Sequence, residues 1–298
     1  MDDLSFTEMP TLNRPILLLA FKGWNNAGRA ATFAAEFFTQ RLAAQKFASL
    51  DPETFYNFIE RRPTVRLHNG ERVLSWPANE FSYARDPGLI QDVIIGLCVE
   101  PHLRWRAYTE LILHVVQECN VELVVTLGAL LADVAYSRPV QVTGMASDSA
   151  LASRLHLEVS KYEGPTGIVG VLHDALRRKG HPAISIWANV PHYIGASPNV
   201  KASLAIVRRV LTLLDFSTDL DDLERASADF DKRVADVIAS DPKVAEYVRR
   251  LEERNDEEDE AQEMPLQSGG IDASPSGDEL AQELQQFLRQ QRRERDNE

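Results

Sequence analysis

Apolar residues occur along the first two thirds of the chain in short runs, separated by longer stretches with helical periodicity. Four runs, at 16–21, 92–97, 122–127 and 183–187, contain few or no alternating polar residues. Such runs are typical of strands that are covered on both faces. The stretches 28–45, 104–118, 167–179 and 199–214 place apolar residues at helical spacing. This alternation predicts a three-layer α/β/α fold with a mostly parallel sheet.

A β-hairpin is predicted where two β-rich segments flank an Asn-Gly dipeptide. The segments are 64–68 and 71–76, and Asn69-Gly70 lies between them. Asn and Gly tolerate the positive φ angles of a type I′ turn, which makes this pair a strong hairpin signal. We expect the hairpin to extend the main sheet as an antiparallel addition.

The pattern changes after residue 217 and predicts a separate helical part. Helical stripes lead to a break at Ser240-Asp241-Pro242, and a second short helix runs into an acidic segment. Residues 263–277, with Pro, Ser and Gly, read as a linker before a last amphipathic helix. The domains are therefore predicted as an α/β core (1–217), a helical subdomain with an acidic end (218–262), and a linker with a C-terminal helix (263–298). The apolar face of that last helix is a candidate for docking on a partner or on the protein itself, and its members are Leu280, Leu284, Phe287 and Leu288.

Charge is distributed unevenly. The chain of 298 residues has a net charge of −13, and the whole excess lies after residue 218, because acidic and basic residues balance before it. Nucleic acid is not expected as a partner, since binding phosphates requires a basic surface. No apolar run reaches the length of a membrane span, and the first residues are acidic, unlike a signal peptide. With only Cys98 and Cys119, both in apolar segments, we expect reduced, buried thiols and a cytoplasmic protein.

Common catalytic motifs are missing from the sequence. It contains no phosphate-binding P-loop, no nucleophile elbow, no H-E-x-x-H and no C-x-x-C. Histidines are scattered, and no pair has ligand spacing on one element, so neither a metal nor another cofactor is expected. These observations favour a protein that is not an enzyme.

Polar side chains nevertheless follow several predicted strands. In parallel sheets the loops after the strands share one edge, where ligands usually bind. The ligand-pocket candidates at this edge are Asn25, Asn26, Glu100, His102, Arg104, Thr126, Asn189 and His192. Three interpretations stay open. The residues could be structural, with asparagines capping a helix and Glu100 pairing with Arg104; they could form a small-molecule or anion pocket; or they could be catalytic, with Glu100 as general acid or base.

The same loops carry a family resemblance. Five blocks look like those of the proteasome assembly chaperone 2 family, in particular its actinobacterial branch, and they lie at 23–28, 100–105, 126–134, 162–168 and 187–193. The resemblance continues into the C-terminal third. It implies a phosphorylase/hydrolase-like α/β/α core, a helical C-terminal subdomain and a homo-oligomer such as a trimer.

Two functional hypotheses follow from the residues and the resemblance together. The first is an oligomeric, non-enzymatic interaction protein similar to proteasome assembly chaperones. Relatives that dock on the proteasome often end in a hydrophobic residue, a tyrosine and one more residue, whereas this sequence ends Arg295-Asp296-Asn297-Glu298, so docking through the tail is not expected. The alternative is a small-molecule binder or enzyme that uses the strand-end pocket, either hydrolase/phosphorylase-like or the ATP-grasp-type ligase that labels some relatives.

Overall fold

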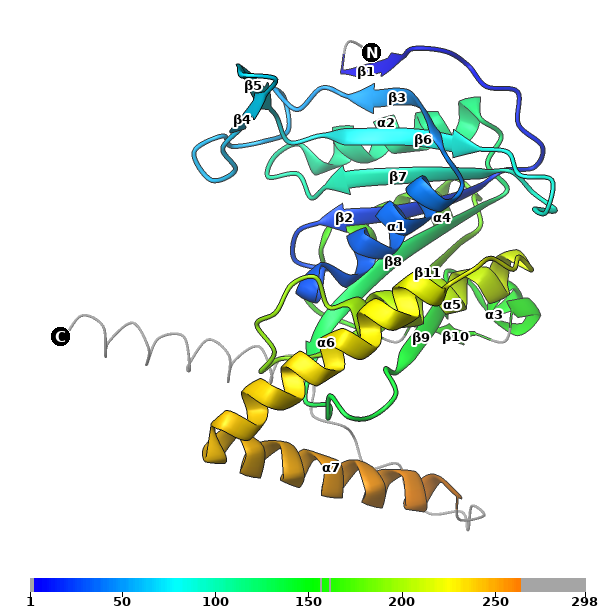
Figure 1. Ribbon diagram of the computed structural model, residues 1–298. Coiled ribbons are helices and arrows are strands. Elements are labelled where there is room, and N and C mark those ends of the chain that lie inside the picture. Colours follow the sequence, from blue (N-terminus) through cyan, green and yellow to red (C-terminus); the bar gives the residue numbers. More distant parts are fainter. Residues whose placement is uncertain (1–2, 156, 161, 264–298) are drawn as a thin grey trace.

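A nine-stranded sheet forms the centre of the molecule. The computed structural model describes residues 3–155, 157–160 and 162–263 (Figure 1). The strands follow the spatial order β1-β3-β6-β7-β2-β8-β11-β9-β10. Their bounds are β1 (Leu4–Phe6), β2 (Ile16–Lys22), β3 (Gln45–Leu50), β6 (Asn79–Ala84), β7 (Val93–Val99), β8 (Leu123–Ala132), β9 (Val142–Ala146), β10 (Glu158–Val159) and β11 (Ala183–Pro191).

The middle of this sheet is parallel. Strands β7, β2, β8 and β11 run in one direction, and all four were predicted from their apolar runs. Strand β6 pairs antiparallel with β7, and β9 pairs antiparallel with β11. The predicted parallel centre is therefore confirmed, and antiparallel strands extend it on both sides.

Helices cover both faces of the sheet, which confirms the three-layer arrangement (Figure 1). Helices α1 (Ala30–Arg41) and α5 (Val200–Leu214) lie on one face, and α2 (Trp105–Glu118) and α4 (Ile168–Arg178) lie on the other. The remaining helices are the 3₁₀ turn η1 (Ala27–Arg29), α3 (Ser149–Leu155), α6 (Asp221–Ser240) and α7 (Pro242–Glu263). Helix α6 packs on α5, and the break between α6 and α7 falls at the predicted Ser240-Asp241-Pro242.

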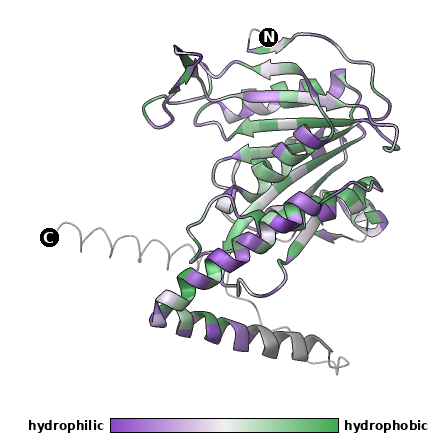
Figure 2. Cartoon of the chain, viewed as in Figure 1, coloured by the Kyte–Doolittle hydropathy of each residue, from purple (hydrophilic) through white to green (hydrophobic). Residues whose placement is uncertain are grey.

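The side chains of β2 explain why its run is continuously apolar. Ile16, Leu18 and Ala20 belong to the core under α1 and α5. The intervening residues of the strand belong to the core under α2 and α4. Because each buried Leu or Ile stabilises the fold by about 1.5–3 kcal/mol, neither face of this strand can be left polar. Figure 2 shows the resulting hydrophobic colour along the central strands and the mixed polar and apolar bands along α6.

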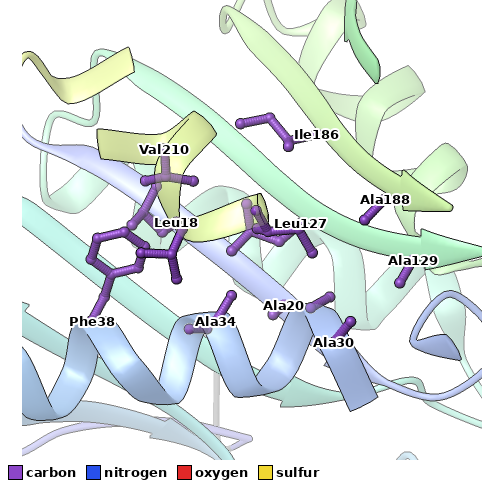
Figure 3. Close-up of a cluster of buried hydrophobic side chains, with 14 of the residues drawn as sticks. Leu18, Ala20, Ala30, Ala34, Phe38, Leu127, Ala129, Ile186, Ala188 and Val210 are labelled. Carbon is purple, nitrogen blue, oxygen red and sulfur yellow. The ribbon is translucent and has the colours of Figure 1, made fainter. Parts of the chain in front are cut away.

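Small side chains set how closely α1 approaches the sheet. Ala30 and Ala34 on α1 lie over Ala20 of β2, and Ala129 and Ala188 lie beside them (Figure 3). At the other end of the helix a larger side chain, Phe38, fills the space under α5. The interior is therefore closely packed along the whole helix.

The hairpin forms, but it does not extend the main sheet. Strands β4 (Thr64–His68) and β5 (Glu71–Ser75) make a separate two-stranded sheet. Asn69 and Gly70 adopt φ angles of 51° and 85°, as a type I′ turn requires. All ten strand residues are exposed. The predicted addition to the main sheet is thus wrong, because β6 itself pairs with β7 and β3 and leaves the hairpin outside.

Other boundaries differ from the prediction as well. The helix predicted to reach residue 45 ends at Arg41, and the edge strand β3 begins at Gln45. Ala43, with φ of 47°, makes the turn between them. The predicted linker at 263–277 and the last amphipathic helix lie outside the described residues, apart from the end of α7 at Glu263.

Both cysteines are buried free thiols, as predicted. Burial raises the pKa of the Cys98 thiol to about 12 and that of Cys119 to about 11. Both thiols therefore stay protonated and poorly reactive at neutral pH.

Candidate functional site

The loops that follow the parallel strands meet at one edge of the sheet. Strands β2, β7, β8 and β11 end at Lys22, Val99, Ala132 and Pro191 and point in the same direction (Figure 1). The eight candidate residues lie in or next to these loops, with Thr126 further back along β8. Their hydrogen bonds decide which of them remain available to a ligand.

Glu100 ties three segments together through its carboxylate. Oε2 accepts a hydrogen bond from the backbone N–H of Trp24 at 2.9 Å, and Oε1 accepts one from the N–H of Ile168 at 3.0 Å. Ile168 is the first residue of α4, where the helix dipole favours a negative charge. The carboxylate thus joins the loop after β2, the end of β7 and the beginning of α4.

Two glycines allow the chain to approach this carboxylate. A Cβ atom at Gly23 would lie 2.6 Å from both Cβ and Oε2 of Glu100. At Gly167 a Cβ would lie 2.9 Å from Oε1 of Glu100 and 2.8 Å from Nδ2 of Asn25. Real Cβ contacts are longer than this, so any side chain at these positions would displace the carboxylate.

Asn25 and Asn26 fix the turn between β2 and α1. Asn25 is buried, and its backbone carbonyl oxygen accepts a hydrogen bond from the N–H of Ala129 at 3.0 Å. The side chain of Asn26 accepts from the N–H of Thr32 at 3.1 Å and donates to its hydroxyl at 2.9 Å. Asn26 thus binds the first turn of α1, in line with the capping role considered from the sequence.

His102 and Arg104 follow Glu100 in the segment between β7 and α2. Nδ1 of His102 accepts a hydrogen bond from the N–H of Asn57 at 3.0 Å, and its Nε2 is 3.8 Å from Glu60. Arg104 is exposed at the start of α2 with φ of 54°. Among the described contacts Arg104 has no ion pair with Glu100. A shallow hollow of ≈ 390 Å³ lies here, and Glu100 and His102 contribute to its wall.

Thr126 lies within β8, and its side chain points toward helix α4 rather than toward the strand-end loops. Its hydroxyl is buried, and it lies 2.8 Å from Nε2 of His173 on α4. Burial lowers the pKa of His173 to about 4, so the imidazole is neutral at neutral pH. The sequence analysis did not single out His173, because a lone histidine on an amphipathic helix carries no specific signal.

Asn189 and His192 belong to a third group around the end of β11. Asn189 Nδ2 donates to Gln141 Oε1 at 3.2 Å. His192 Nδ1 is 2.9 Å from Asp133 Oδ1, and its ring stacks edge-on against Tyr247 of α7 at 5.7 Å. The Tyr247 hydroxyl also reaches Asp133, at 3.3 Å. This cluster attaches α7 to the sheet edge.

The candidates therefore share an edge but divide into separate networks. Glu100, Asn25 and Asn26 hold loops together, His102 lies beside them, and Thr126 pairs with α4. Asn189 and His192 lie near α6 and α7. In the part of the chain that the structure describes, no group of three or more His, Cys, Asp or Glu side chains could hold a metal ion.

Replacing Glu100 with alanine is expected to lower the free energy of unfolding by about 2 kcal/mol, because two backbone amides lose a charged acceptor. Urea denaturation measures the change. Glu110→Ala, which removes an exposed carboxylate from α2, is the control and should leave stability nearly unchanged. If Glu100→Ala lowers the free energy of unfolding no more than Glu110→Ala does, the two hydrogen bonds from Trp24 and Ile168 do not stabilise the fold as described.

These features define a mixed α/β protein whose strand-end loops are joined by polar side chains that bind backbone groups. The chain belongs to the PAC2 family, whose model matches residues 20–238. The resemblance seen in the five sequence blocks is thereby confirmed. No curated protein matches the chain.

Solved structures support the same assignment. A PAC2 family protein from Streptomyces avermitilis is 42% identical, with a TM-score of 0.73, over 78% of this chain and 99% of the other. A proteasome-assembly chaperone homologue from Mycobacterium tuberculosis is 40% identical, with a TM-score of 0.71 and the same coverage. An archaeal proteasome activator from Pyrococcus furiosus shares the fold at 21% identity, with a TM-score of 0.64 over 80% of this chain and 99% of the other.

In the part of the chain that the structure describes, none of the helices has both the length and the apolar character needed to span a membrane.

Proposed function

We propose that this protein is a non-enzymatic assembly factor that binds proteasome subunits through its α/β body, and that it acts as a cytoplasmic homo-oligomer. The relative from Mycobacterium tuberculosis, a proteasome-assembly chaperone homologue, supports this choice of partner. We also propose that the core has the phosphorylase/hydrolase-like fold that the family resemblance implies. The structural use of Glu100 and Asn26 favours binding over catalysis, since both side chains hold loops in place.

The observation that carries the proposal is the exposed apolar face of the β4–β5 hairpin. Val65 lies opposite Leu74 in the register, and Leu67 follows Val65 on the same face. These three side chains are 48%, 56% and 74% exposed. We call them the hairpin face. An isolated two-stranded hairpin is only marginally stable in water, and an exposed apolar patch usually marks an interface.

The position and charge of the hairpin fit a protein partner. The hairpin projects from the sheet on the side where β2 and β7 end (Figure 1). Trp76, just after β5, stacks edge-on against Phe58 at 4.9 Å, which attaches the hairpin to the body. Arg72 pairs with Leu67, so it lies on the hairpin face, and it is exposed, which would favour an acidic partner surface.

The double variant Leu67→Asp/Leu74→Asp is expected to weaken binding to purified actinobacterial proteasome α-subunits at least roughly tenfold, because both charges would be placed in an apolar interface. Surface plasmon resonance measures the affinity, and sedimentation velocity measures the oligomeric state in the same samples. The melting temperature should not fall, since both side chains are exposed in the free protein.

Val73→Asp is the matched control. It places one aspartate on the same hairpin, but Val73 pairs with Arg66 on the opposite face, and the single variant Leu74→Asp gives the comparison at equal charge. The binding of Val73→Asp should stay close to that of the wild type. Equal losses in both variants would argue against a specific hairpin face, and no binding by the wild type would refute the proposed function.

The terminal docking candidates Leu280, Leu284, Phe287 and Leu288 lie outside the described residues and stay a prediction. Deleting residues 264–298 separates the two routes. Retained binding would assign the contact to the body, and lost binding would assign it to the terminal segment.

A further inference from the structure

The turn of the β4–β5 hairpin exposes an asparagine followed by a glycine. Asn69 and Gly70 are both exposed, and a Cβ atom at Gly70 would have no neighbour within 4 Å. In the part of the chain that the structure describes, no hydrogen bond holds the Asn69 side chain or the N–H of Gly70. The side-chain amide and the backbone nitrogen after it are therefore both available for reaction.

These two groups can react with each other. The nitrogen of Gly70 attacks Cγ of Asn69, the Cγ–Nδ2 bond breaks, and ammonia leaves with the proton of the Gly70 N–H. Water then opens the resulting succinimide ring at one of its two carbonyl–nitrogen bonds. Cleavage of the side-chain bond gives aspartate, and cleavage of the main-chain bond gives isoaspartate. The net reaction consumes one water and releases one ammonia.

Asn120 shows that exposure and backbone conformation alone do not permit this reaction. It is exposed, and its φ of 51° equals that of Asn69. The next residue, Val121, donates its N–H to the carbonyl of Val116 at 2.9 Å, and its side chain is β-branched. The attacking nitrogen is thus hydrogen-bonded and shielded after Asn120. After Asn69 it is neither, because glycine has no side chain.

The hairpin also has the freedom that ring closure requires. The attack needs a rotation about the Cα–C bond of Asn69, so the turn must open first. Among the described residues β4 and β5 pair only with each other, and their residues are exposed. An isolated two-stranded hairpin is marginally stable, so local opening costs little free energy.

We propose that Asn69 is a site of spontaneous deamidation, with water as the co-reactant, and that isoaspartate at this position opens the β4–β5 hairpin. Isoaspartate adds a carbon to the main chain of a two-residue turn, so the pairing of His68 with Glu71 is lost. Aspartate keeps the turn, because Asp-Gly also suits type I′, and adds only a negative charge. The isoaspartate form no longer presents the hairpin face and loses partner binding, and this consequence alone rests on the proposed function.

Mass spectrometry of the full chain tests the modification without any partner. The protein is incubated in H₂¹⁸O at mildly alkaline pH and then digested. The peptide with Asn69 should gain about 3 Da, because hydrolysis introduces one oxygen-18, and about tenfold faster than the peptide with Asn120. Asn69→Gly keeps a Gly-Gly turn of the same type and should show no gain there. Equal rates at Asn69 and Asn120 would overturn the assignment.

A second measurement tests the opening of the hairpin. Methyl transfer by protein isoaspartate methyltransferase identifies the isoaspartate fraction, and NMR records the cross-strand contact between Val65 and Leu74. This contact should be lost in the isoaspartate form and kept in Asn69→Asp. Its persistence in the isoaspartate form would refute the opening.

Binding of the same fractions to purified actinobacterial proteasome α-subunits is measured separately. The isoaspartate form should bind about tenfold more weakly than the fresh protein, and equal binding would refute the loss of the hairpin face. No binding by the fresh protein would refute the proposed function instead, and the mass gain at Asn69 would be unaffected.

Discussion

Replacing Asn79 with alanine is expected to lower the free energy of unfolding by about 4 kcal/mol, the largest loss from any single substitution proposed for this protein. Asn79 is fully buried in β6, beneath α2. Its Oδ1 faces three donors, the N–H of Val99 at 2.8 Å and the hydroxyls of Tyr56 at 2.8 Å and Tyr108 at 2.9 Å. Each hydroxyl has one proton, which it shares with the backbone carbonyl of Val99, at 2.6 Å from Tyr56 and 3.3 Å from Tyr108. Alanine would leave the Val99 N–H without this acceptor in a dry interior and would open a small cavity.

The orientation of this amide follows from one of its partners. A backbone N–H can only donate, so the atom that faces Val99 must be the oxygen. The nitrogen Nδ2 then points elsewhere and has no partner among the described residues. Burial raises the pKa values of the Tyr56 and Tyr108 hydroxyls, so both remain protonated donors.

Two further variants, Tyr108→Phe and the double variant with Asn79→Ala, show how much of this loss comes from the hydrogen bond between the two residues. Tyr108→Phe removes one of the three donors and is expected to cost about 1 kcal/mol, because Asn79 keeps the other two. Urea denaturation of both single variants and of the double variant measures the coupling. If Asn79→Ala costs no more than Tyr108→Phe, the three-donor network does not stabilise the core as described.

The sequence predicted the central strands because their burial leaves a clear pattern. Strand β2 is apolar at six successive positions, 16–21, since each side faces a helical layer. Strand β6 was missed because it contains Asn79, Glu80 and Ser82, residue types that are uncommon in strands. Strand β3 was also missed, and its first residue, Gln45, was assigned to a helix because the alanines before it continue a helical pattern.

The candidate site was predictable in place but not in its contacts. Parallel strands bring their following loops to one edge, so the positions of Glu100 and Asn25 followed from the fold. The partners of Glu100 did not, because they are backbone amides 76 and 68 residues away, and an amide has no residue-specific signal.

Acid is expected to destabilise the protein through His173, by about 3 kcal/mol between neutral pH and pH 4. In the folded protein burial lowers the pKa of this imidazole to about 4, against an ordinary value of 6.5. The unfolded chain therefore binds the proton more readily. The stability that the neutral His173 imidazole contributes is fully present above pH 6.5. It decreases as the pH falls below that value, and the decrease levels off below the folded pKa of about 4.

The measurement is the free energy of unfolding by urea across this pH range for the wild type and His173→Gln. The variant cannot titrate at this position, so its stability should fall less steeply between pH 6.5 and 4. Thr126→Val removes the hydroxyl 2.8 Å from Nε2 but leaves the imidazole buried, so this control should keep the steep acid dependence. Parallel pH profiles for the wild type and His173→Gln would mean that the imidazole is open to protonation in the folded protein, and would contradict its burial between α4 and the sheet.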